Sequence, residues 1–165
     1  MKTIFLSQGK HTVVDDEDYE YLSAFKWHWV KDGNTVGYAA RNCRLSINKR
    51  VTLLMHKAIF NHLGLRDSID HINRNGLDNR RNNLRPATQQ QNNYNKPVKN
   101  TSGFKGVSIY FNKKKNIFRW RTRVYANGKN IPVGYFKDKV EAAKAYDREV
   151  IKWQGNFAWL NFPSS

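Results

Sequence analysis

The sequence predicts an α+β protein, and three features of the chain lead to that class. Up to residue 54, short runs of β-branched and aromatic residues alternate with turn residues, as in a set of short strands. From residue 103, three runs with period-two alternation precede a segment whose apolar residues fall at helical spacing. Between them lies a polar stretch, residues 69–93, which is rich in Asn and contains an Asp-His pair. We therefore expect a β-rich N-terminal scaffold, a small polar unit, and a three-stranded antiparallel sheet packed on one α-helix.

Length and composition limit the class of protein. A chain of 165 residues can form one or two small domains, and an aromatic content of 13% favours folded structure. The lone Cys43 excludes an internal disulfide and a four-cysteine zinc site, and it fits a reducing compartment. No apolar run approaches the length of a membrane span, and the N-terminus lacks a signal-peptide pattern. We expect a cytoplasmic protein with no membrane partner.

The first 60 residues supply the expected scaffold. Candidate strands, chosen for their β-branched and aromatic residues, are Thr3–Leu6, Lys10–Val14, Trp27–Val30, Tyr38–Arg41 and Arg50–Leu54. Acidic residues 15–18 predict a short helix at about 16–24, because carboxylates stabilise a helix N-terminus. A metal site is a less favoured reading of this cluster, since no histidine lies near it in sequence. A second helix is expected to open at Leu53–Phe60, where His56 is more readily a packing residue than a site residue.

Residues 69–93 bring together groups that suit one metal ion. Asp70 and His71 come first, a turn rich in Asn and Gly follows, and a short helix then carries Asn92. Oxygen ligands suit a hard divalent cation such as Mg²⁺ or Mn²⁺, and an imidazole can take a proton from water near neutral pH. Thr88 predicts the helix start, because Gln91 completes a capping box. Each feature alone is an ordinary strand end, turn or polar linker, but their combination favours a metal site.

Several short anchors stand at fixed offsets in this stretch: Asp70-His71, Asp78-Asn79-Arg80, Asn83-Leu84-Arg85, Ala87-Thr88 and Asn92. Together they resemble the phage and intron-encoded branch of the His-Asn-His (HNH) nuclease family. The resemblance implies a ββα-metal unit, in which two strands and a helix surround one divalent ion. It implies His71 as the residue that activates water, and Asp70 and Asn92 as metal ligands. Asn83 would hold the loop.

Strand geometry alone does not explain how Asp70 and His71 reach one ion, because successive side chains on a strand point to opposite faces. A bend in the Asn-rich turn is plausible, but that both residues face the metal is implied only by the resemblance. Arg80 and Arg85 are expected to hold neighbouring phosphates of the substrate. The apolar contacts of the unit are expected from Ile69, Ile72, Leu77 and Leu84.

The positive charge of the chain predicts a polyanionic partner. The net charge is +16, and residues 96–165 contribute +11 of it, with 15 Lys and Arg against 4 Asp and Glu. A basic surface without a ligand is the alternative, but nothing else in the sequence offsets so much like charge. The C-terminal part is therefore the expected holder of nucleic acid.

The C-terminal part is predicted as a sheet followed by one helix. Its strands are expected at Val107–Phe111, Phe118–Tyr125 and Asn130–Phe136. Asn127-Gly128 predicts a two-residue hairpin turn, and Asp138 with Glu141 predicts a helix N-terminus. The expected core face consists of Val107, Ile109, Trp120, Thr122, Val124, Ile131 and Val133, covered by Val140, Ala143, Tyr146, Val150 and Trp153 of the helix.

Alternation places the remaining strand residues on the opposite, exposed face. They are Ser108, Tyr110, Arg119, Arg121, Arg123, Tyr125, Asn130 and Pro132. Three arginines on one face favour contact with anions, and a sheet can enter a major groove, where Arg contacts guanine edges and phosphates. Lys113, Lys114 and Lys115 in the first turn are expected either to add phosphate contacts or to be simply solvated.

The motifs Gly106-Val107, Trp120, Gly134-Tyr135-Phe136, residues 141–147 (EAAKAYD) and residues 160–163 (LNFP) stand in this part. They resemble the plant ethylene-response-factor DNA-binding domain. The resemblance implies a three-stranded sheet laid in the major groove. Ser108 and Pro132 depart from the plant pattern, which has Arg and Trp there, so base preferences do not carry over.

These features together predict a metal-dependent DNA endonuclease that hydrolyses phosphodiester bonds, of the homing or nicking type found in phages and mobile elements. The expected domains are residues 1–95, with the nuclease core at 53–95, then a linker at 96–102 and a DNA-binding domain at 103–163. Double-stranded DNA is the expected partner, bound by a monomer or a dimer, with no cofactor beyond the metal. If a phage encodes the chain, the compartment is the bacterial host cytoplasm. The alternatives are a non-catalytic transcription regulator and, less favoured, an RNA-binding protein.

Overall fold

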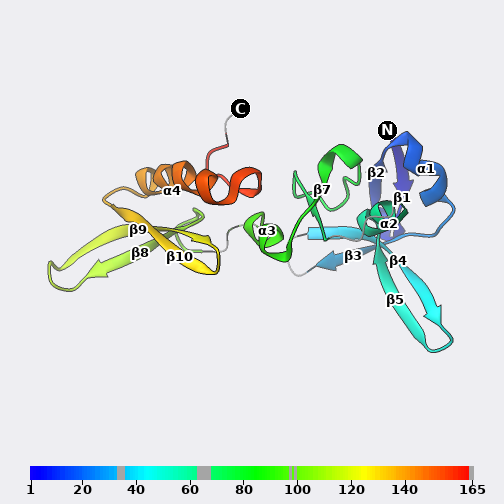
Figure 1. Ribbon diagram of the computed structural model, residues 1–165, viewed down its shortest axis with the longest axis horizontal. Coiled ribbons are helices and arrows are strands. Elements are labelled where there is room, and N and C mark those ends of the chain that lie inside the picture. The colour runs from blue at the N-terminus through cyan, green and yellow to red at the C-terminus, as the bar shows by residue number, and fades with distance from the viewer. Residues whose placement is uncertain (33–35, 63–67, 97, 99, 164–165) are drawn as a thin grey trace. The chain divides into compact units, whose positions relative to one another are not determined.

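The computed structural model describes residues 1–32, 36–62, 68–96, 98 and 100–163 (Figure 1). The chain divides into two compact units, Met1–Asn92 and Asn93–Ser165, which we call the N-terminal unit and the C-terminal unit. Across the described ranges the strands form four small antiparallel sheets, and the α+β class is therefore confirmed. The predicted linker at 96–102 includes residues 97 and 99, which lie outside the described residues.

The N-terminal unit contains three of these sheets and several short helices. Its strands are β1 (Lys2–Phe5) paired with β2 (His11–Val14), then β3 (His28–Asp32), β4 (Val36–Ser46) and β5 (Lys49–Leu54) in that order, and β6 (Ile69–His71) paired with β7 (Leu84–Pro86). Its helices are η1 (Ser7–Gly9), α1 (Asp16–Ser23), α2 (Met55–His62), η2 (Arg81–Asn83) and α3 (Gln89–Tyr94), which runs two residues past the unit.

Strand β4 is much longer than the predicted Tyr38–Arg41. The polar residues of this strand beyond Arg41 face solvent in a two-stranded ribbon with β5, and the sequence pattern therefore did not predict that part of the strand. Figure 1 shows this ribbon projecting from the rest of the unit. Arg44 and Arg50 are direct cross-strand partners near its tip.

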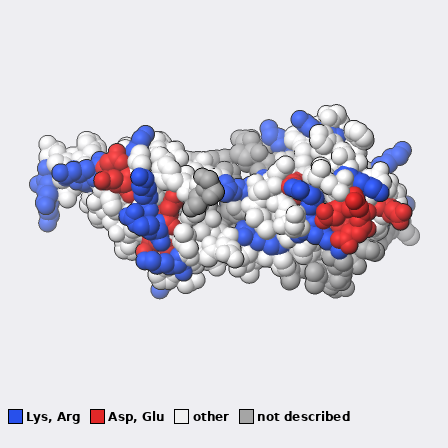
Figure 2. Space-filling model, turned by 90° about the horizontal axis from the view of Figure 1, so that it is seen from above, with Lys and Arg blue, Asp and Glu red and all other residues white. Residues whose placement is uncertain are grey.

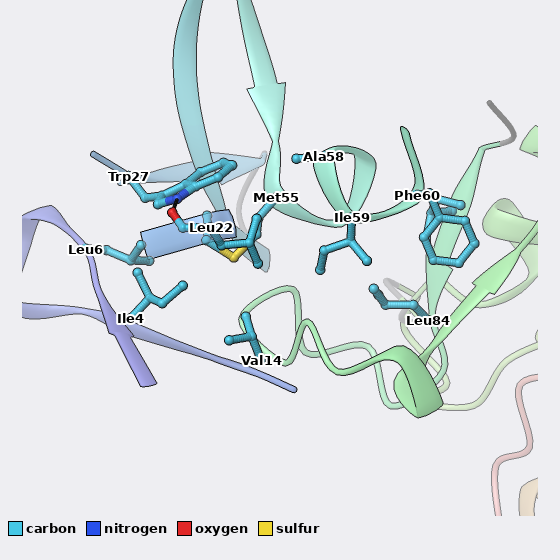
Figure 3. Close-up of a cluster of buried hydrophobic side chains, with 12 residues drawn as sticks. Ile4, Leu6, Val14, Leu22, Trp27, Met55, Ala58, Ile59, Phe60 and Leu84 are labelled. Carbon is cyan, nitrogen blue, oxygen red and sulfur yellow. Dashed lines mark hydrogen bonds between the residues drawn. The ribbon is translucent and has the colours of Figure 1, made fainter. Parts of the chain in front are cut away.

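One hydrophobic core holds the N-terminal unit together (Figure 3). Helix α2 contributes Met55, Ala58 and Ile59, each at most 1% exposed, at the spacing of one helix face. Ile69 of β6 and Leu84 of β7 join the same cluster as the N-terminal strands. The strands that carry the Asp-His pair are therefore anchored in the same core as the scaffold.

The C-terminal unit is a three-stranded sheet packed on one long helix. Its elements are β8 (Val107–Asn112), β9 (Ile117–Ala126), β10 (Lys129–Phe136), α4 (Lys139–Gln154) and η3 (Gly155–Phe157), and the strand order is β10-β9-β8. Asn127 and Gly128 both have positive φ, 51° and 76°, which confirms the predicted hairpin turn. The Asp138 side chain accepts hydrogen bonds from the backbone of Val140 and Glu141, which confirms the predicted helix cap.

The prediction that three residues pack in a core is wrong. Ile109 is 54% exposed, because the β8–β9 hairpin extends beyond the end of α4 and leaves that stretch uncovered (Figure 1). Trp153 is 44% exposed, and Gln154 is buried in its place, since the row of helix positions on the sheet continues in steps of four from Tyr146 and Val150. Ile72 is 44% exposed, because the chain leaves β6 for a turn just after His71.

The exposed face of the C-terminal sheet also gains a residue that alternation did not assign. A bulge between Pro132 and Gly134 shifts the register of β10 against β9, and Tyr135 then pairs with Arg121. The ring of Tyr135 lies 4.8 Å from that of Tyr110, centroid to centroid.

In the described part of the chain, no helix has the length and apolar character needed to cross a membrane.

Candidate metal and nuclease site

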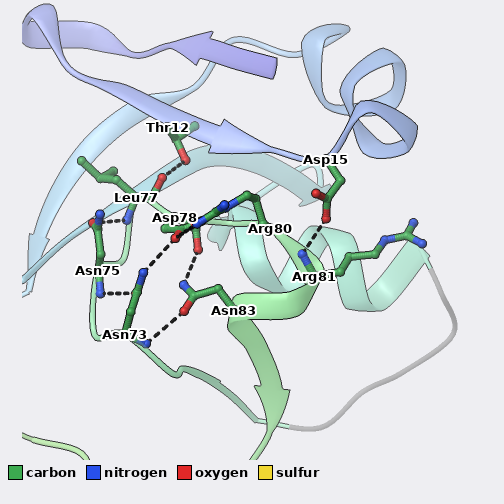
Figure 4. Close-up of polar contacts among 9 residues, drawn as sticks. All are labelled: Thr12, Asp15, Asn73, Asn75, Leu77, Asp78, Arg80, Arg81 and Asn83. Atoms are coloured by element: carbon green, nitrogen blue, oxygen red, sulfur yellow. Dashed lines mark hydrogen bonds and ion pairs between the residues drawn. The ribbon is translucent and has the colours of Figure 1, made fainter. Parts of the chain in front are cut away.

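Asn83 closes the loop between β6 and β7 (Figure 4). Its Oδ1 accepts a hydrogen bond from the Asn73 backbone at 2.9 Å, and its Nδ2 donates to the Asp78 carbonyl at 2.8 Å. Its own carbonyl accepts from the Ile72 backbone at 2.8 Å. Asn83 is only 6% exposed, so a substitution that removes its amide leaves buried backbone groups without partners.

Asparagine side chains also shape the turn inside this loop. The Oδ1 of Asn73 accepts from the Asn75 backbone at 2.9 Å, and the Oδ1 of Asn75 accepts from the Leu77 backbone at 3.1 Å. Asn73 Nδ2 donates to the Asp78 carboxylate at 2.8 Å. The Asn-rich composition is therefore what folds the loop, because short amide side chains satisfy turn backbone that has no strand partner.

His71 lies at the end of β6 in a cluster of rings. It is 6% exposed, and its ring centroid is 4.9 Å from that of His56 and 5.7 Å from that of Tyr38. Burial lowers the pKa of His71 below its ordinary 6.5, although the hydrogen bond with Asn79 and the carboxylate of Asp70 oppose this shift. The imidazole is therefore biased toward the neutral form, which can accept a proton.

Asp70 precedes His71 and is held by Arg85. The two residues are cross-strand partners in the β6–β7 pair, so their side chains share a face. Two nitrogens of Arg85 donate to Oδ2 of Asp70, at 2.6 and 2.9 Å. All three residues of β6 are buried, so Asp70 and His71 are covered on both faces of this short strand.

Asn92 reaches back from α3 to the start of β6. Its Nδ2 donates to Ser68 Oγ at 3.0 Å and to the Ile69 carbonyl at 3.5 Å. Its Oδ1 is buried and has no hydrogen-bond partner among the described residues. The reciprocal bonds between Thr88 and Gln91, at 2.7 and 3.2 Å, confirm the predicted capping box that begins this helix.

These groups fit a hard divalent cation. A buried amide oxygen without a partner is costly unless a ligand satisfies it, and Asn92 Oδ1 is such an atom. The fold brings Asn92 to Ser68 and Ile69, the two residues that precede the buried carboxylate of Asp70. An amide oxygen and a carboxylate are the ligand types that Mg²⁺ and Mn²⁺ favour.

A second acidic cluster, Asp15, Glu17 and Asp18, has ligand atoms within 4.8 Å of one another. It is occupied by Arg81, whose guanidinium contacts Glu17 and Asp18 at 2.7 Å and whose backbone N–H donates to Asp15 at 2.8 Å. Figure 2 shows acidic side chains gathered at the α1 end of this unit. The cluster therefore serves to join α1 to the loop before β7.

The arginines predicted to clamp phosphates are engaged inside the N-terminal unit. Arg80 forms two hydrogen bonds of 2.7 Å with Asp78, and these bonds lower the pKa of that carboxyl. Arg85 holds Asp70, as described above. That these arginines contact phosphates of the substrate stays a prediction. Both side chains already have a carboxylate partner within the unit.

The predicted DNA-binding residues of the C-terminal unit do gather on one sheet. Arg119, Arg121 and Arg123 stand at alternate positions of β9, paired across to Tyr110, to Ser108 and Tyr135, and to Pro132. The Arg121 guanidinium lies 5.8 Å from the Tyr110 ring, and its buried Nε has no partner among the described residues. Lys113, Lys114 and Lys115 are exposed in the β8–β9 turn.

Sequence reasoning missed residues that only folding brings to His71. His56 was expected to pack, and it does lie buried, but next to the predicted base. Burial, and then the charge of His71, lower the pKa of His56 from 6.5 to about 3. Tyr38, which contacts His71, and Thr12, which contacts Asn79, come from other strands, and no sequence signal marked them.

Comparison with known proteins identifies the family. An uncharacterized HNH endonuclease of Acanthamoeba polyphaga mimivirus is 30% identical over 164 residues, which cover 94% of this chain and 78% of the viral protein. APETALA2-like protein 2 of Oryza sativa is 35% identical over 66 residues, and an AP2-like ethylene-responsive transcription factor of Arabidopsis thaliana is 33% identical over 66. Each plant match covers 40% of this chain and about one seventh of the plant protein. No protein-family model and no solved structure matches. Because the viral enzyme aligns over nearly the whole chain, this protein belongs to the HNH endonuclease family.

Proposed function

We propose that this protein is a divalent-metal-dependent DNA endonuclease, with its chemistry in the N-terminal unit and its main grip on DNA in the C-terminal unit. The observation that carries the proposal is the arrangement around β6. A buried histidine follows a buried aspartate, and the amide of Asn92 reaches the same strand through its nitrogen, while its buried oxygen has no partner among the described residues. We propose that β6, β7 and α3 form the ββα-metal unit that the sequence resembles.

Each side chain has a proposed role. His71 accepts a proton from the attacking water, and the bond between phosphorus and the 3′ oxygen breaks as the water oxygen attacks. Asp70 and Asn92 hold the cation, with Arg85 fixing the carboxylate. When bound, the cation supplies charge neutralisation at the scissile phosphate and stabilises the departing oxygen. Asn83 keeps the loop that positions these groups.

The C-terminal unit is proposed to select the DNA site. Its sheet presents three arginines and two tyrosines in ring contact on one face, and one of the plant relatives that match part of this chain is named as a transcription factor. One metal unit per chain would nick one strand, so a double-strand break would need two chains or two sequential events.

The test is nicking of supercoiled plasmid by the full-length protein with Mg²⁺ or Mn²⁺. His71→Ala should lower the nicking rate by at least about 100-fold, because it removes the general base, and should leave the affinity for DNA within about twofold. His11→Ala changes an exposed histidine of β2 and is the matched control.

Two outcomes would contradict the proposal. Loss of DNA binding in His71→Ala would assign that residue a structural role. Tight, metal-independent binding with no cleavage at any sequence of a randomised DNA library would favour the non-catalytic regulator instead.

A further inference from the structure

The side chain of Asn79 has only one orientation that satisfies its surroundings. Asn79 is fully buried, and its Nδ2 donates to Thr12 Oγ1 at 2.8 Å and to the Gly76 carbonyl at 3.4 Å. The Thr12 hydroxyl donates its single proton to the Leu77 carbonyl at 2.7 Å (Figure 4). It can therefore only accept from Asn79, which fixes the amide nitrogen toward Thr12.

The opposite end of the amide meets the imidazole. Asn79 Oδ1 lies 3.3 Å from Nε2 of His71, and an amide oxygen can only accept a hydrogen bond. Nε2 must then carry the proton. A neutral imidazole carries one N–H, so Nδ1 becomes the nitrogen with the lone pair.

We propose that Thr12 and Asn79 form a relay that sets the tautomer of His71, so that Nδ1 is the basic nitrogen of the nuclease site. The inference rests on the proposed role of His71 and goes beyond it, because it names the proton-accepting atom and two positioning residues. The direction of every hydrogen bond follows from a single constraint, the proton that Thr12 gives to Leu77.

Strand β2 is built to hold this relay. Val13 donates its backbone N–H to the Leu77 carbonyl at 3.0 Å, and the Asn79 backbone donates to the Val13 carbonyl at 2.9 Å. Both bonds are made by Val13, the residue after Thr12, so they hold the loop beside Thr12, which is itself fully buried. The N-terminal strands would thus act on the chemistry as well as support the fold.

The pair Thr12→Val and Thr12→Ser separates this role from packing. Valine keeps the shape but cannot accept from Asn79, whereas serine keeps the hydroxyl. Leu77 still accepts from Val13 in either variant, so no buried carbonyl is left without a partner. In Thr12→Val only the long bond to the Gly76 carbonyl, at 3.4 Å, still holds the NH₂ group. The amide can then turn that group toward His71, which would place the proton on Nδ1.

The measurement is long-range ¹H–¹⁵N NMR of the imidazoles in the full-length protein, with His71→Asn used to assign the signals. We expect a protonated Nε2 and an unprotonated Nδ1 on His71 in the wild type and in Thr12→Ser. Thr12→Val should show the other tautomer or a mixture, and its kcat for nicking should fall about 10- to 100-fold with KM nearly unchanged.

A wild-type His71 with its proton on Nδ1 would overturn the relay, whether or not Thr12→Val folds. So would a folded Thr12→Val with wild-type signals and wild-type kcat. If the relay tautomer is present but the protein does not cleave DNA, the proposed function fails and the relay stands. If DNA is cleaved with the opposite tautomer, the reverse holds.

Discussion

Three arginines of the N-terminal unit and three of the C-terminal sheet have opposite kinds of surroundings. In the N-terminal unit each of three arginines binds a carboxylate: Arg80 with Asp78, Arg81 with Asp18, and Arg85 with Asp70. In the C-terminal sheet, none of Arg119, Arg121 and Arg123 forms a salt bridge with any described residue. A paired guanidinium orients other side chains, whereas an unpaired one keeps its charge available for an anion. The difference supports a division between an N-terminal unit that cuts and a C-terminal unit that grips.

The largest effect should come from a substitution that abolishes DNA cleavage and leaves DNA binding intact. Asn92→Ala removes the buried oxygen that has no partner in the part of the chain that the structure describes. Nicking should fall by at least about 100-fold, because charge stabilisation by the cation is lost. Asn93→Ala, at the exposed neighbouring position, is the matched control. Affinity for DNA should not change. Equal losses of binding and cleavage in Asn92→Ala would contradict the division.

The converse substitution should weaken DNA binding and leave cleavage at saturating DNA intact. Replacing Arg119, Arg121 and Arg123 together by Ala should lower DNA affinity by about 100-fold. The slope of log affinity against log salt concentration should fall by the amount that corresponds to roughly two to three phosphate contacts. Lys144→Ala with Arg148→Ala, on the exposed surface of α4, tests charge without the sheet. Cleavage at saturating DNA should persist in both. Binding that is unchanged after loss of all three arginines would move the DNA surface elsewhere.

A backbone change can test whether the units fold separately. Gly106 has φ +75°, and a Cβ there would lie 2.0 Å from the Tyr146 ring. Gly106→Ala should therefore destabilise the C-terminal unit by about 2–3 kcal/mol. Hydrogen exchange should rise in β8, β9, β10 and α4 and stay unchanged in β6. Gly128→Ala, where nothing lies within 4 Å, should cost less, from backbone strain alone. Exchange that rises equally in both units would show one cooperative fold.

The smallest expected effect, at a mildly acid pH of about 5.5, is a loss of stability confined to the N-terminal unit. The pKa of His56 is lowered to about 3 in the folded protein, so the unfolded chain, with a pKa near 6.5, binds the proton first. Stability is then full above pH 6.5 and falls as the pH drops toward 3, by about 1.4 kcal/mol per pH unit. Imidazole NMR should show no protonation of His56 at pH 5.5, and His56→Phe should remove this part of the acid loss. A His56 that titrates near 6.5 would refute the prediction.

Local signals were read correctly where the interacting residues are neighbours in sequence. The Asn127-Gly128 turn, the Asp138 cap and the Thr88–Gln91 capping box all formed as expected, because each depends on a few adjacent backbone groups. Alternation also assigned the arginines of β9 to one face. It failed at Ile109, since a face can be predicted from the period of a strand but the length of the helix that covers it cannot.

The sequence by itself determined the α+β class, the loop-forming asparagines and the basic sheet, since periodicity, turn chemistry and charge are local properties of the chain. Tertiary structure alone decided what surrounds His71. Tyr38 of β4 and His56 of α2 contact the imidazole, and Thr12 of β2 contacts the Asn79 side chain that lies against it. These residues meet only because their elements share one core with β6. The same packing determined which arginines are neutralised, because a carboxylate partner such as Asp18 lies 63 residues from Arg81 in the chain. Contacts of that separation leave no periodic trace in a sequence, and so they had to be seen in the fold.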